Sequence, residues 1–283
     1  MVFIMKEVVK NEDESIILKF LYETIIGRIL LLFITRATFS KLVTWLLDCR
    51  ISVIFIKPFI KKNNIDTSLY EDKKYKSFND YFTRNKKEIN IDENKEAFIS
   101  PCDCKLSVYK ASDRTFKIKH IDYSLDSLLK NSELAKEYRD DYVVICRLTP
   151  DNYHRYCYID SGYHGTNKKI RGVLNTVRPI AVENKKVYVT NQRSYTVLDT
   201  DNFGKVIQVE VGALMVGKIK NEHKNYFFTK GEEKGFFKYG GSTIILLVKK
   251  DNVKIDNYLI NNTKKGYETI INMGDKIGIK KED

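Results

Sequence analysis

The stretch from Lys230 to Val248 reads KGEEKGFFKYGGSTIILLV and indicates two β-strands joined by a turn at Gly240-Gly241. The segment after the turn, Thr243–Val248, is an unbroken run of aliphatic and β-branched side chains, which favours a strand. A Gly-Gly pair between two strands is typical of a hairpin turn, and a serine directly after it is unremarkable by itself. The first interpretation of this stretch is therefore structural.

Similar strand-like segments recur from Ala97 onward, each rich in β-branched and aromatic residues and bounded by Gly, Asn or Asp. They comprise Phe98–Ile99, Tyr142–Leu148, Lys186–Thr190, Tyr195–Leu198 and Val206–Val211. Many short strands at this spacing predict an α+β protein whose main domain, residues 67–283, is a mainly antiparallel β-sandwich or barrel-like structure. A helical insertion is expected at Leu125–Tyr138. The sequence has no internal repeat, no GxGxxG and no P-loop.

The region before this domain, residues 1–66, has a different pattern. Between Leu21 and Ile60, short apolar runs alternate with basic residues, and none reaches the roughly 18 residues that a membrane-spanning helix needs. The pattern predicts amphipathic helices with basic edges and aromatic side chains such as Trp45, which can lie in the lipid interface. An ordinary helical subdomain packed on the core is the alternative. Pro58 and the polar stretch after it end the region.

The composition limits the classes of partner. The 283 residues are 43% hydrophobic and 12% aromatic, which indicates a folded protein. A net charge of +12 favours a polyanionic partner, either nucleic acid or an anionic lipid surface, unless the excess lysines are only solvated surface. Nothing resembles a nucleic-acid-binding motif, so an anionic membrane is the preferred partner and no nucleic acid is expected.

The cysteines predict free thiols rather than disulfides or a metal site. Their number is odd, and residues 1–16 lack the features of a secretory signal, which together indicate a reducing compartment. The pair Cys102-x-Cys104 has no matching second pair, so no metal is expected. The five residues are Cys49, Cys102, Cys104, Cys146 and Cys157.

A Gly-Gly-Ser-Thr turn also permits chemistry. Without a side chain on Gly241, a nucleophile can reach its carbonyl, and the permissive backbone can hold a strained peptide. Ser242 Oγ stands next to that carbonyl, so it can take over the acyl group from its own nitrogen. Elimination from the resulting ester and hydrolysis then leave a pyruvoyl group, a ketone that can form a Schiff base with a substrate amine and replace pyridoxal phosphate.

Several blocks of the chain together resemble the phosphatidylserine decarboxylase family. Their order and spacing match the family over most of the length. The blocks are Phe78-Asn-Asp-Tyr-Phe-Thr-Arg84, Ser100-Pro-Cys-Asp-Cys-Lys105, Leu148-Thr-Pro-Asp-Asn-Tyr-His-Arg155, Phe203-Gly with Val211-Gly-Ala and Val216-Gly, Lys230-Gly-Glu-Glu through Gly240-Gly-Ser-Thr243, Gly266-Tyr-Glu-Thr and Gly274-Asp-Lys-Ile-Gly.

The resemblance implies a proenzyme that is cut between Gly241 and Ser242 into a β chain, 1–241, and an α chain, 242–283. It also implies an Asp-His-Ser charge relay for this cut, with Asp103, His154 and Ser242 at the matching positions. Base assistance to a serine typically supplies ~10²–10⁴-fold in rate. Taken alone, Asp103 is more often a turn residue and His154 a core or surface histidine.

Two positions depart from the family pattern. The family has His-Arg-x-His where this chain has His154-Arg155-Tyr156-Cys157, so either His154 serves as the base, or Cys157 takes part of the role, or self-processing is impaired. A thiolate at Cys157 would need neighbours such as Arg155 to lower its pKa; the alternative is a small buried apolar residue. Cys104 replaces a glycine, which is costly if that position needs a positive φ.

The expected activity is decarboxylation of phosphatidylserine to phosphatidylethanolamine, with a pyruvoyl cofactor made from Ser242 and neither pyridoxal phosphate nor a metal. The expected partners are phosphatidylserine, an anionic membrane surface and the chain's own two pieces, with a homodimer left open. The expected place is the cytoplasmic face of the cell membrane, as a peripheral protein. Two alternatives are a non-processing lipid-binding protein of the same fold and a biotinyl- or lipoyl-type carrier; the second lacks a modifiable lysine at a hairpin tip.

Overall fold

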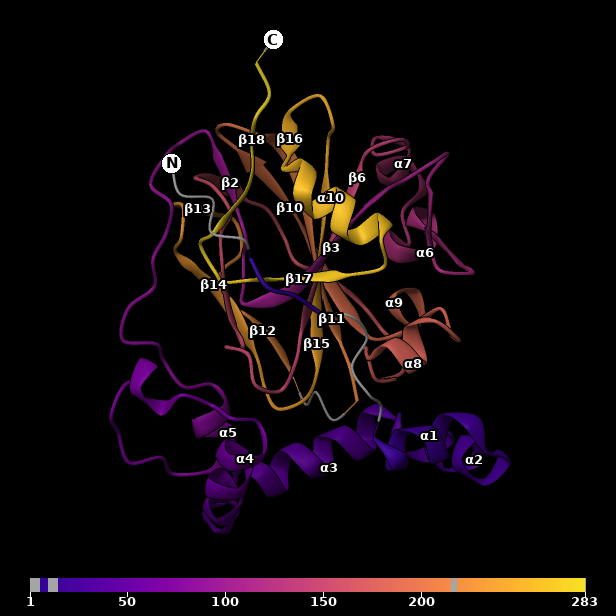
Figure 1. Cartoon of the computed structure of the whole chain (residues 1–283), viewed down its shortest axis with the longest axis vertical. Coiled ribbons are helices and arrows are strands. Elements are labelled where there is room, and N and C mark those ends of the chain that lie inside the picture. Colours follow the sequence, from indigo (N-terminus) through magenta and orange to yellow (C-terminus); the bar gives the residue numbers. More distant parts are fainter. Residues whose placement is uncertain (1–5, 10–14, 215–217, 283) are drawn as a thin grey trace.

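A computed structural model describes residues 6–9, 15–214 and 218–282 of the chain. Its centre is a ten-stranded antiparallel sheet in the order β1-β17-β3-β6-β15-β11-β10-β8-β13, with β9 paired to β10 (Figure 1). These strands are β1 (Val8–Val9), β17 (Glu268–Ile271), β3 (Cys104–Lys110), β6 (Tyr142–Leu148), β15 (Ser242–Val248), β11 (Gly204–Gly212), β10 (Arg193–Thr200), β8 (Gly162–His164), β13 (Tyr226–Phe228) and β9 (Lys168–Ile170).

Smaller sheets and short helices complete the β-rich part. The strands are β12 (Ile219–Asn221), β14 (Glu233–Phe237) and β7 (Arg155–Cys157) in one sheet, β16 (Val253–Ile255), β18 (Lys276–Lys280) and β2 (Ala97–Ile99) in another, and the hairpin of β4 (Thr115–Ile118) and β5 (Ile121–Ser124). The helices are α5 (Phe78–Phe82), α6 (Leu125–Leu129), α7 (Ser132–Lys136), α8 (Pro179–Val182), α9 (Val187–Thr190) and α10 (Asn257–Lys264), with the 3₁₀ turn η2 (Thr67–Leu69).

The two faces of the large sheet carry different layers. On one face, Glu210 of β11 forms a fully buried ion pair of 2.7 Å with Lys234 of β14, so the β12-β14-β7 sheet packs on this side. Ser242 lies directly opposite Gly212 in the β11–β15 register, two positions from Glu210, and therefore shares this face. The opposite face carries Arg147 and is covered by α8, α9 and the β4–β5 hairpin. We call these the Ser242 face and the Arg147 face.

The expected α+β class with mainly antiparallel sheets is confirmed. Within the described residues the large sheet is open, because β1 and β13 stand at its two ends and are not paired with each other, so barrel closure is not found. The predicted strands at Phe98–Ile99, Tyr142–Leu148, Tyr195–Leu198, Val206–Val211 and Thr243–Val248 all lie within observed strands.

The strand predicted at Lys186–Thr190 is wrong, because Val187–Thr190 forms the short helix α9. Its β-branched residues favour a strand, but Val187 and Tyr188 are buried against the Arg147 face, and this packing overrides the local preference. The helical insertion at Leu125–Tyr138 is two helices, α6 and α7, separated at Lys130, which has φ +50°. The motif residues Val216 and Gly217 lie outside the described residues.

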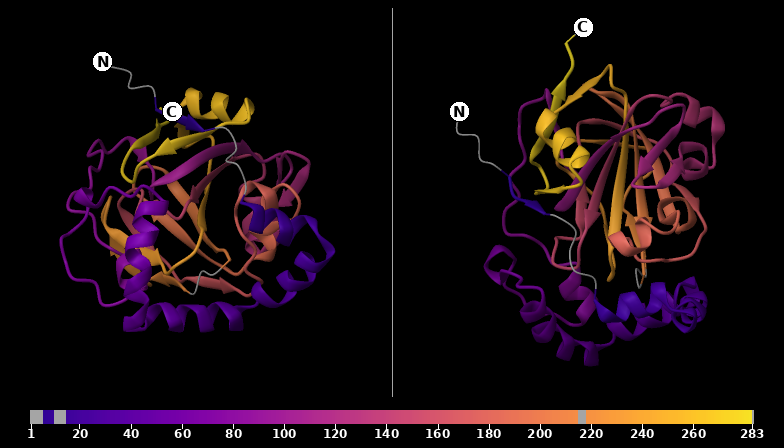
Figure 2. Two further views of the ribbon diagram at one scale, coloured as in Figure 1. Left: turned by 60° about the horizontal axis from the view of Figure 1, so that its bottom comes forward. Right: turned by 45° about the vertical axis from the view of Figure 1, so that its right-hand side comes forward.

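Helices formed by residues 16–62 run along one end of the β-rich part (Figures 1 and 2). Side chains of Ser15 and Thr24 cap the first two, which explains why each begins where it does. No single helix in the described part is long and apolar enough to cross a membrane; only α2 and α3 taken together have the necessary length and apolar character, and they are bent by 70° relative to each other. The elements are α1 (Ile16–Glu23), α2 (Ile25–Ile34), α3 (Ala37–Asp48), the 3₁₀ helix η1 (Arg50–Phe55) and α4 (Ile56–Lys62).

Candidate active site

Ser242 is the first residue of β15, a central strand of the large sheet. It pairs with Gly212 of β11 on one side and with Leu148 of β6 on the other. The residue is fully buried, and its Oγ has no hydrogen-bond partner within the part of the chain that the structure describes. A buried hydroxyl without a partner costs about 1–3 kcal/mol, so this position is better suited to a reacting group than to a structural one.

The turn before Ser242 is held by the N-terminal helices. Tyr239 N–H donates to Asn79 Oδ1 at 3.3 Å, and Asn79 in turn donates to Asp48 at the end of α3. The Tyr239 ring packs against Phe78 and Phe82 of α5, with ring centres 5.1 and 5.2 Å away. The position and aim of the Gly241–Ser242 peptide are therefore tied to the same helices that carry the exposed apolar side chains.

Gly240 shows why the turn needs glycine. Its φ of +132° is a conformation that side chains with a Cβ rarely adopt. Gly241 is different, since a Cβ there would meet the nearest atom, of Val177, at an ordinary 3.5 Å. Crowding therefore does not require glycine at position 241. The absence of a side chain on Gly241 leaves its carbonyl open on that side.

His154 lies beside this turn, in the loop between β6 and β7. Its ring packs on Phe82 with centres 4.1 Å apart and is fully buried. Nδ1 lies 2.9 Å from the Asn152 carbonyl, whereas Nε2 has no hydrogen-bond partner among the described residues. With Nδ1–H donating to Asn152, Nε2 of the neutral ring is unprotonated and can accept a proton, and the Gly240 backbone, like that of Asn152, favours the protonated ring.

Burial and a neighbouring cation keep this histidine neutral. Desolvation, followed by the nearby Arg84 guanidinium, lowers the pKa of His154 to about 3. Arg84 is itself fully buried between two aromatic rings, 4.1 Å from the centre of Tyr70 and 4.8 Å from that of Tyr81. At neutral pH the imidazole is therefore unprotonated and can accept a proton, but a pKa of about 3 makes it a weak base.

Asp103 lies in the turn that precedes β3, and its charge acts on Cys157 and on Tyr153, the residue before His154. Its carboxylate forms an ion pair with Lys86 Nζ, with an oxygen–nitrogen distance of 2.6 Å. It also accepts a hydrogen bond of 2.9 Å from the Met273 backbone N–H. Among the described residues no hydrogen bond joins Asp103 to His154, nor His154 to Ser242. The three relay residues expected from the sequence are thus not connected in a hydrogen-bonded chain in this structure.

Cys157 is buried next to the Asp103 turn, with its N–H donating to the Pro101 carbonyl at 2.9 Å. Burial raises the pKa of the Cys157 thiol to about 12. Arg155, expected to help ionise it, instead forms an ion pair with Glu233 at 2.7 Å. The thiol is therefore neutral at pH 7, and its geometry suits a small core residue better than a base. Cys104 is not among the residues with positive φ, so replacing glycine there brings no backbone strain.

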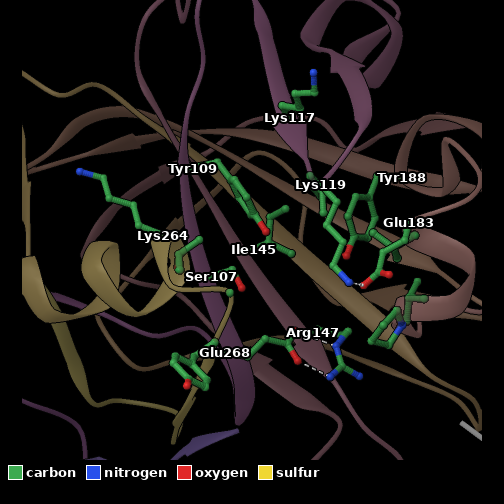
Figure 3. A pocket seen from close by; sticks show the side chains of 17 residues that line it. Ser107, Tyr109, Lys117, Lys119, Ile145, Arg147, Glu183, Tyr188, Lys264 and Glu268 are labelled. Atoms are coloured by element: carbon green, nitrogen blue, oxygen red, sulfur yellow. Dashed lines mark hydrogen bonds and ion pairs between the residues drawn. The ribbon is translucent and has the colours of Figure 1, made fainter. Parts of the chain in front are cut away.

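One cavity lies at the turn, and a second lies farther along the Arg147 face. The smaller, about 140 Å³, is lined by Gly240 and Gly241 together with Arg147, Thr176 and Arg178. The larger, about 340 Å³, lies on the Arg147 face and shares Arg147 with the smaller one. Figure 3 shows its polar lining, where Arg147 reaches Glu268 and Lys119 reaches Glu183. At the turn itself, Arg178 is the lining cation besides the Glu268-paired Arg147, and a guanidinium suits a ligand that carries a phosphate or carboxylate.

Several residues around this centre were not expected from their sequence pattern. Asn79 and Phe82 lie within a motif that the sequence singles out, but their contacts to the turn and to His154 join residues more than 70 positions apart. Lys86, the partner of Asp103, follows the same motif without belonging to it. Local sequence carries no signal for such long-range pairs, apart from the presence of the motif itself.

Comparison with known proteins gives consistent results. The sequence model described as phosphatidylserine decarboxylase matches residues 78–279. The chain is similar to "Phosphatidylserine decarboxylase proenzyme 2" of Clostridium acetobutylicum, with 49% identity over 265 residues, covering 92% of this chain and 91% of the relative. It is also similar to "Phosphatidylserine decarboxylase proenzyme" of Clostridium botulinum strain Hall, with 41% identity covering 96% and 98%. The proenzyme of Clostridium perfringens is 41% identical over 92% and 91%.

Proposed function

The chain belongs to the phosphatidylserine decarboxylase family, and on that premise we propose that it is a proenzyme that cuts itself between Gly241 and Ser242. The reaction of the family is the removal of CO2 from phosphatidylserine, which leaves phosphatidylethanolamine. The observation that carries the proposal is the buried Ser242 hydroxyl directly after the Gly240–Gly241 turn, which has no hydrogen-bond partner among the residues that the structure describes. The relatives' name, proenzyme, supports it.

The proposed cut uses groups of this chain alone. Ser242 Oγ attacks the carbonyl carbon of Gly241, and its proton passes by way of His154 Nε2 to the nitrogen of residue 242, which leaves the carbonyl. Loss of the Cα proton of residue 242 then expels the Gly241 carboxylate. Water replaces the nitrogen, which departs as ammonia, and a pyruvoyl terminus remains on residue 242.

The site fits such a group. Gly241, the residue before Ser242, lines a cleft of about 140 Å³ together with Arg178, the cation that we propose for an anionic lipid headgroup. When present, the ketone serves as an electron sink for the electron pair released as CO2 leaves.

Intact mass spectrometry of the purified protein tests this proposal. We expect two polypeptides, residues 1–241 and 242–283. The smaller one should be lighter by one ammonia than a 242–283 peptide with a free serine amino terminus, and it should not react with amine reagents. Vesicles containing phosphatidylserine should release CO2 in its presence. A single chain of unaltered mass, purified with bound anionic lipid and without CO2 release, would instead identify a non-processing lipid-binding protein of the same fold. The missing hydrogen bonds among Asp103, His154 and Ser242 favour this second candidate.

We also propose that the helices α1 to α4 rest on the membrane surface. Most of the exposed large hydrophobic side chains of the described chain lie between residues 16 and 55, and Phe33 and Trp45 are 67% and 62% exposed. Such an apolar surface with basic edges suits an anionic lipid interface. Because Tyr239 and Asn79 tie the turn to these helices, this docking would place the Gly241–Ser242 site near the headgroups. The free thiols accord with the cytoplasmic leaflet.

Trp45, the single tryptophan of the chain, gives a direct measurement of this docking. Its fluorescence should shift to shorter wavelength when phosphatidylserine-containing vesicles are added. Phe33→Ser removes an exposed apolar side chain worth about 1.5–3 kcal/mol on burial, so vesicle affinity should fall at least about tenfold. Phe227→Ser, at a 79% exposed position of β13 outside these helices, is the matched control and should leave affinity unchanged. Equal losses in both variants would contradict the proposed surface.

A further inference from the structure

Three cysteine side chains meet in the core close to the Asp103 turn. The Sγ atoms of Cys102, Cys104 and Cys146 all lie within 4.8 Å of one another. Each residue is at most 1% exposed, and all three are free thiols. The sequence shows only the Cys102-x-Cys104 pair, and the third thiol is supplied by β6, the strand next to β3 in the sheet. The expectation of no metal site depended on the absence of further nearby ligands, which the fold provides.

The distances fit a small, soft cation. For three atoms no more than 4.8 Å apart, some point lies within about 2.8 Å of all three, whereas a zinc–thiolate bond is about 2.3 Å long. Each sulfur would therefore need to move inward by only about 0.5 Å, within the reach of a small side-chain rotation. Thiolates select Cu⁺ and Zn²⁺ over the harder cations Mg²⁺ and Ca²⁺.

The backbone around the thiols is already fixed in place. Cys104 pairs with Ile271 of β17, and Cys146 pairs with Leu106 and Ile244 of the two neighbouring strands. Ser100 Oγ donates to the Cys102 carbonyl at 2.7 Å and lies 3.8 Å from Cys104 Sγ. Ser100 is therefore a candidate fourth ligand for a tetrahedral ion, and a three-coordinate ion would use the thiolates alone. Because these residues are already ordered, metal binding would cost little further conformational entropy.

We propose that Cys102, Cys104 and Cys146 bind one thiophilic metal ion, Zn²⁺ or Cu⁺, as a structural site. The ion would join the Ser100–Cys104 turn to β6. This turn carries Asp103, and β6 ends at Leu148, the partner of Ser242. Because the thiols are buried, the ion would have to enter as the chain folds. The simpler alternative, three small apolar side chains that fill a gap in the core, predicts no bound metal.

Metal content of the full-length chain tests the proposal. The protein is produced with added Zn²⁺ in one arm and added copper under reducing conditions in the other, then dialysed against a weak chelator and measured by plasma mass spectrometry. We expect about one ion per chain in one of the arms. Cys104→Ala and Cys146→Ala should lose it, and Cys49→Ala, which alters a thiol outside the cluster, should retain it.

A second readout covers variants that fold poorly. Protein produced with Cd²⁺ should show a near-ultraviolet thiolate-to-metal absorption band, and the band should weaken in Cys102→Ser, which changes a single atom and preserves the shape of the core. The proposal would be overturned if no arm gave wild-type protein with stoichiometric metal. It would also be overturned if the cluster variants retained as much metal as Cys49→Ala. Neither result depends on whether the chain cuts itself at Gly241.

Discussion

Ser242→Ala is expected to remain a single chain of 33.1 kDa and to release no CO2 from phosphatidylserine. The variant lacks the only atom of residue 242 that can attack the Gly241 carbonyl, so neither the ester nor the ketone forms. Folding should be preserved, because the Ser242 hydroxyl makes no hydrogen bond within the described residues and its removal leaves only a small gap. Denaturing electrophoresis and intact mass measure the cut, and CO2 release measures the activity.

Thr243→Val is a closely matched control. Thr243 is also fully buried, and its hydroxyl has no partner in the described part of the chain, but it is the strand neighbour of Arg147 and lies on the opposite face of the sheet. This variant should therefore process normally. Ser242→Cys keeps a nucleophile at the same position and should still cut, although more slowly if the thioester is slow to eliminate. Two fragments from Ser242→Ala would show that another group attacks and would reject the proposed mechanism.

His154→Ala should slow self-cleavage by ~10²–10⁴-fold, the usual contribution of a positioned general base. Cys157→Ala should change the rate by no more than a few-fold, because that thiol is protonated and packed against the Pro101 turn. Both variants remove a buried side chain, so thermal unfolding must show that each is folded under the assay conditions. Rates are followed by the loss of full-length chain after synthesis. Fast processing in His154→Ala with slow processing in Cys157→Ala would assign the base to Cys157.

The pH dependence separates the same two assignments. With a pKa of about 3, His154 is neutral across pH 5 to 8, so its contribution to the cleavage rate should be flat there. A base with the pKa of Cys157, about 12, would give a rate that rises about tenfold per pH unit over this range. Because burial lowers the pKa of His154 from its ordinary value of 6.5, the histidine favours the folded state most at a pH above 6.5. This contribution to stability is lost as the pH falls from 6.5 toward 3.

The sequence was informative where local chemistry decides the structure. The run Thr243–Val248 predicts a strand because its side chains are β-branched and aliphatic, and the Gly-Gly pair marks the turn because Gly240 needs an unusual φ. The same reasoning failed at Val187–Thr190, where burial against the sheet overrides the preference of β-branched residues. Local preference and tertiary packing agreed at the first segment and disagreed at the second.

The candidate site was harder to predict, because most of it is built from distant segments. Ser242 could be named from its neighbours in the chain. The contact of His154 with Phe82, the ion pair of Asp103 with Lys86 and the approach of Cys146 to Cys102 depend on how strands and loops are arranged in space. Sequence spacing alone cannot supply such pairings, and the role of each residue in the relay stays a prediction.

The position of β15 has a consequence for the mature protein. Residues 242–283 supply β15, which lies between β11 and β6, β17, which lies between β1 and β3, and β18, which lies between β16 and β2. A chain cut after Gly241 would therefore consist of two interleaved polypeptides that cannot part without breaking both sheets. Unfolding of the cut protein would also separate its two chains, so its melting temperature should rise with protein concentration. Refolding would require the two chains to associate again. Such a protein can be assembled efficiently only once, before the cut.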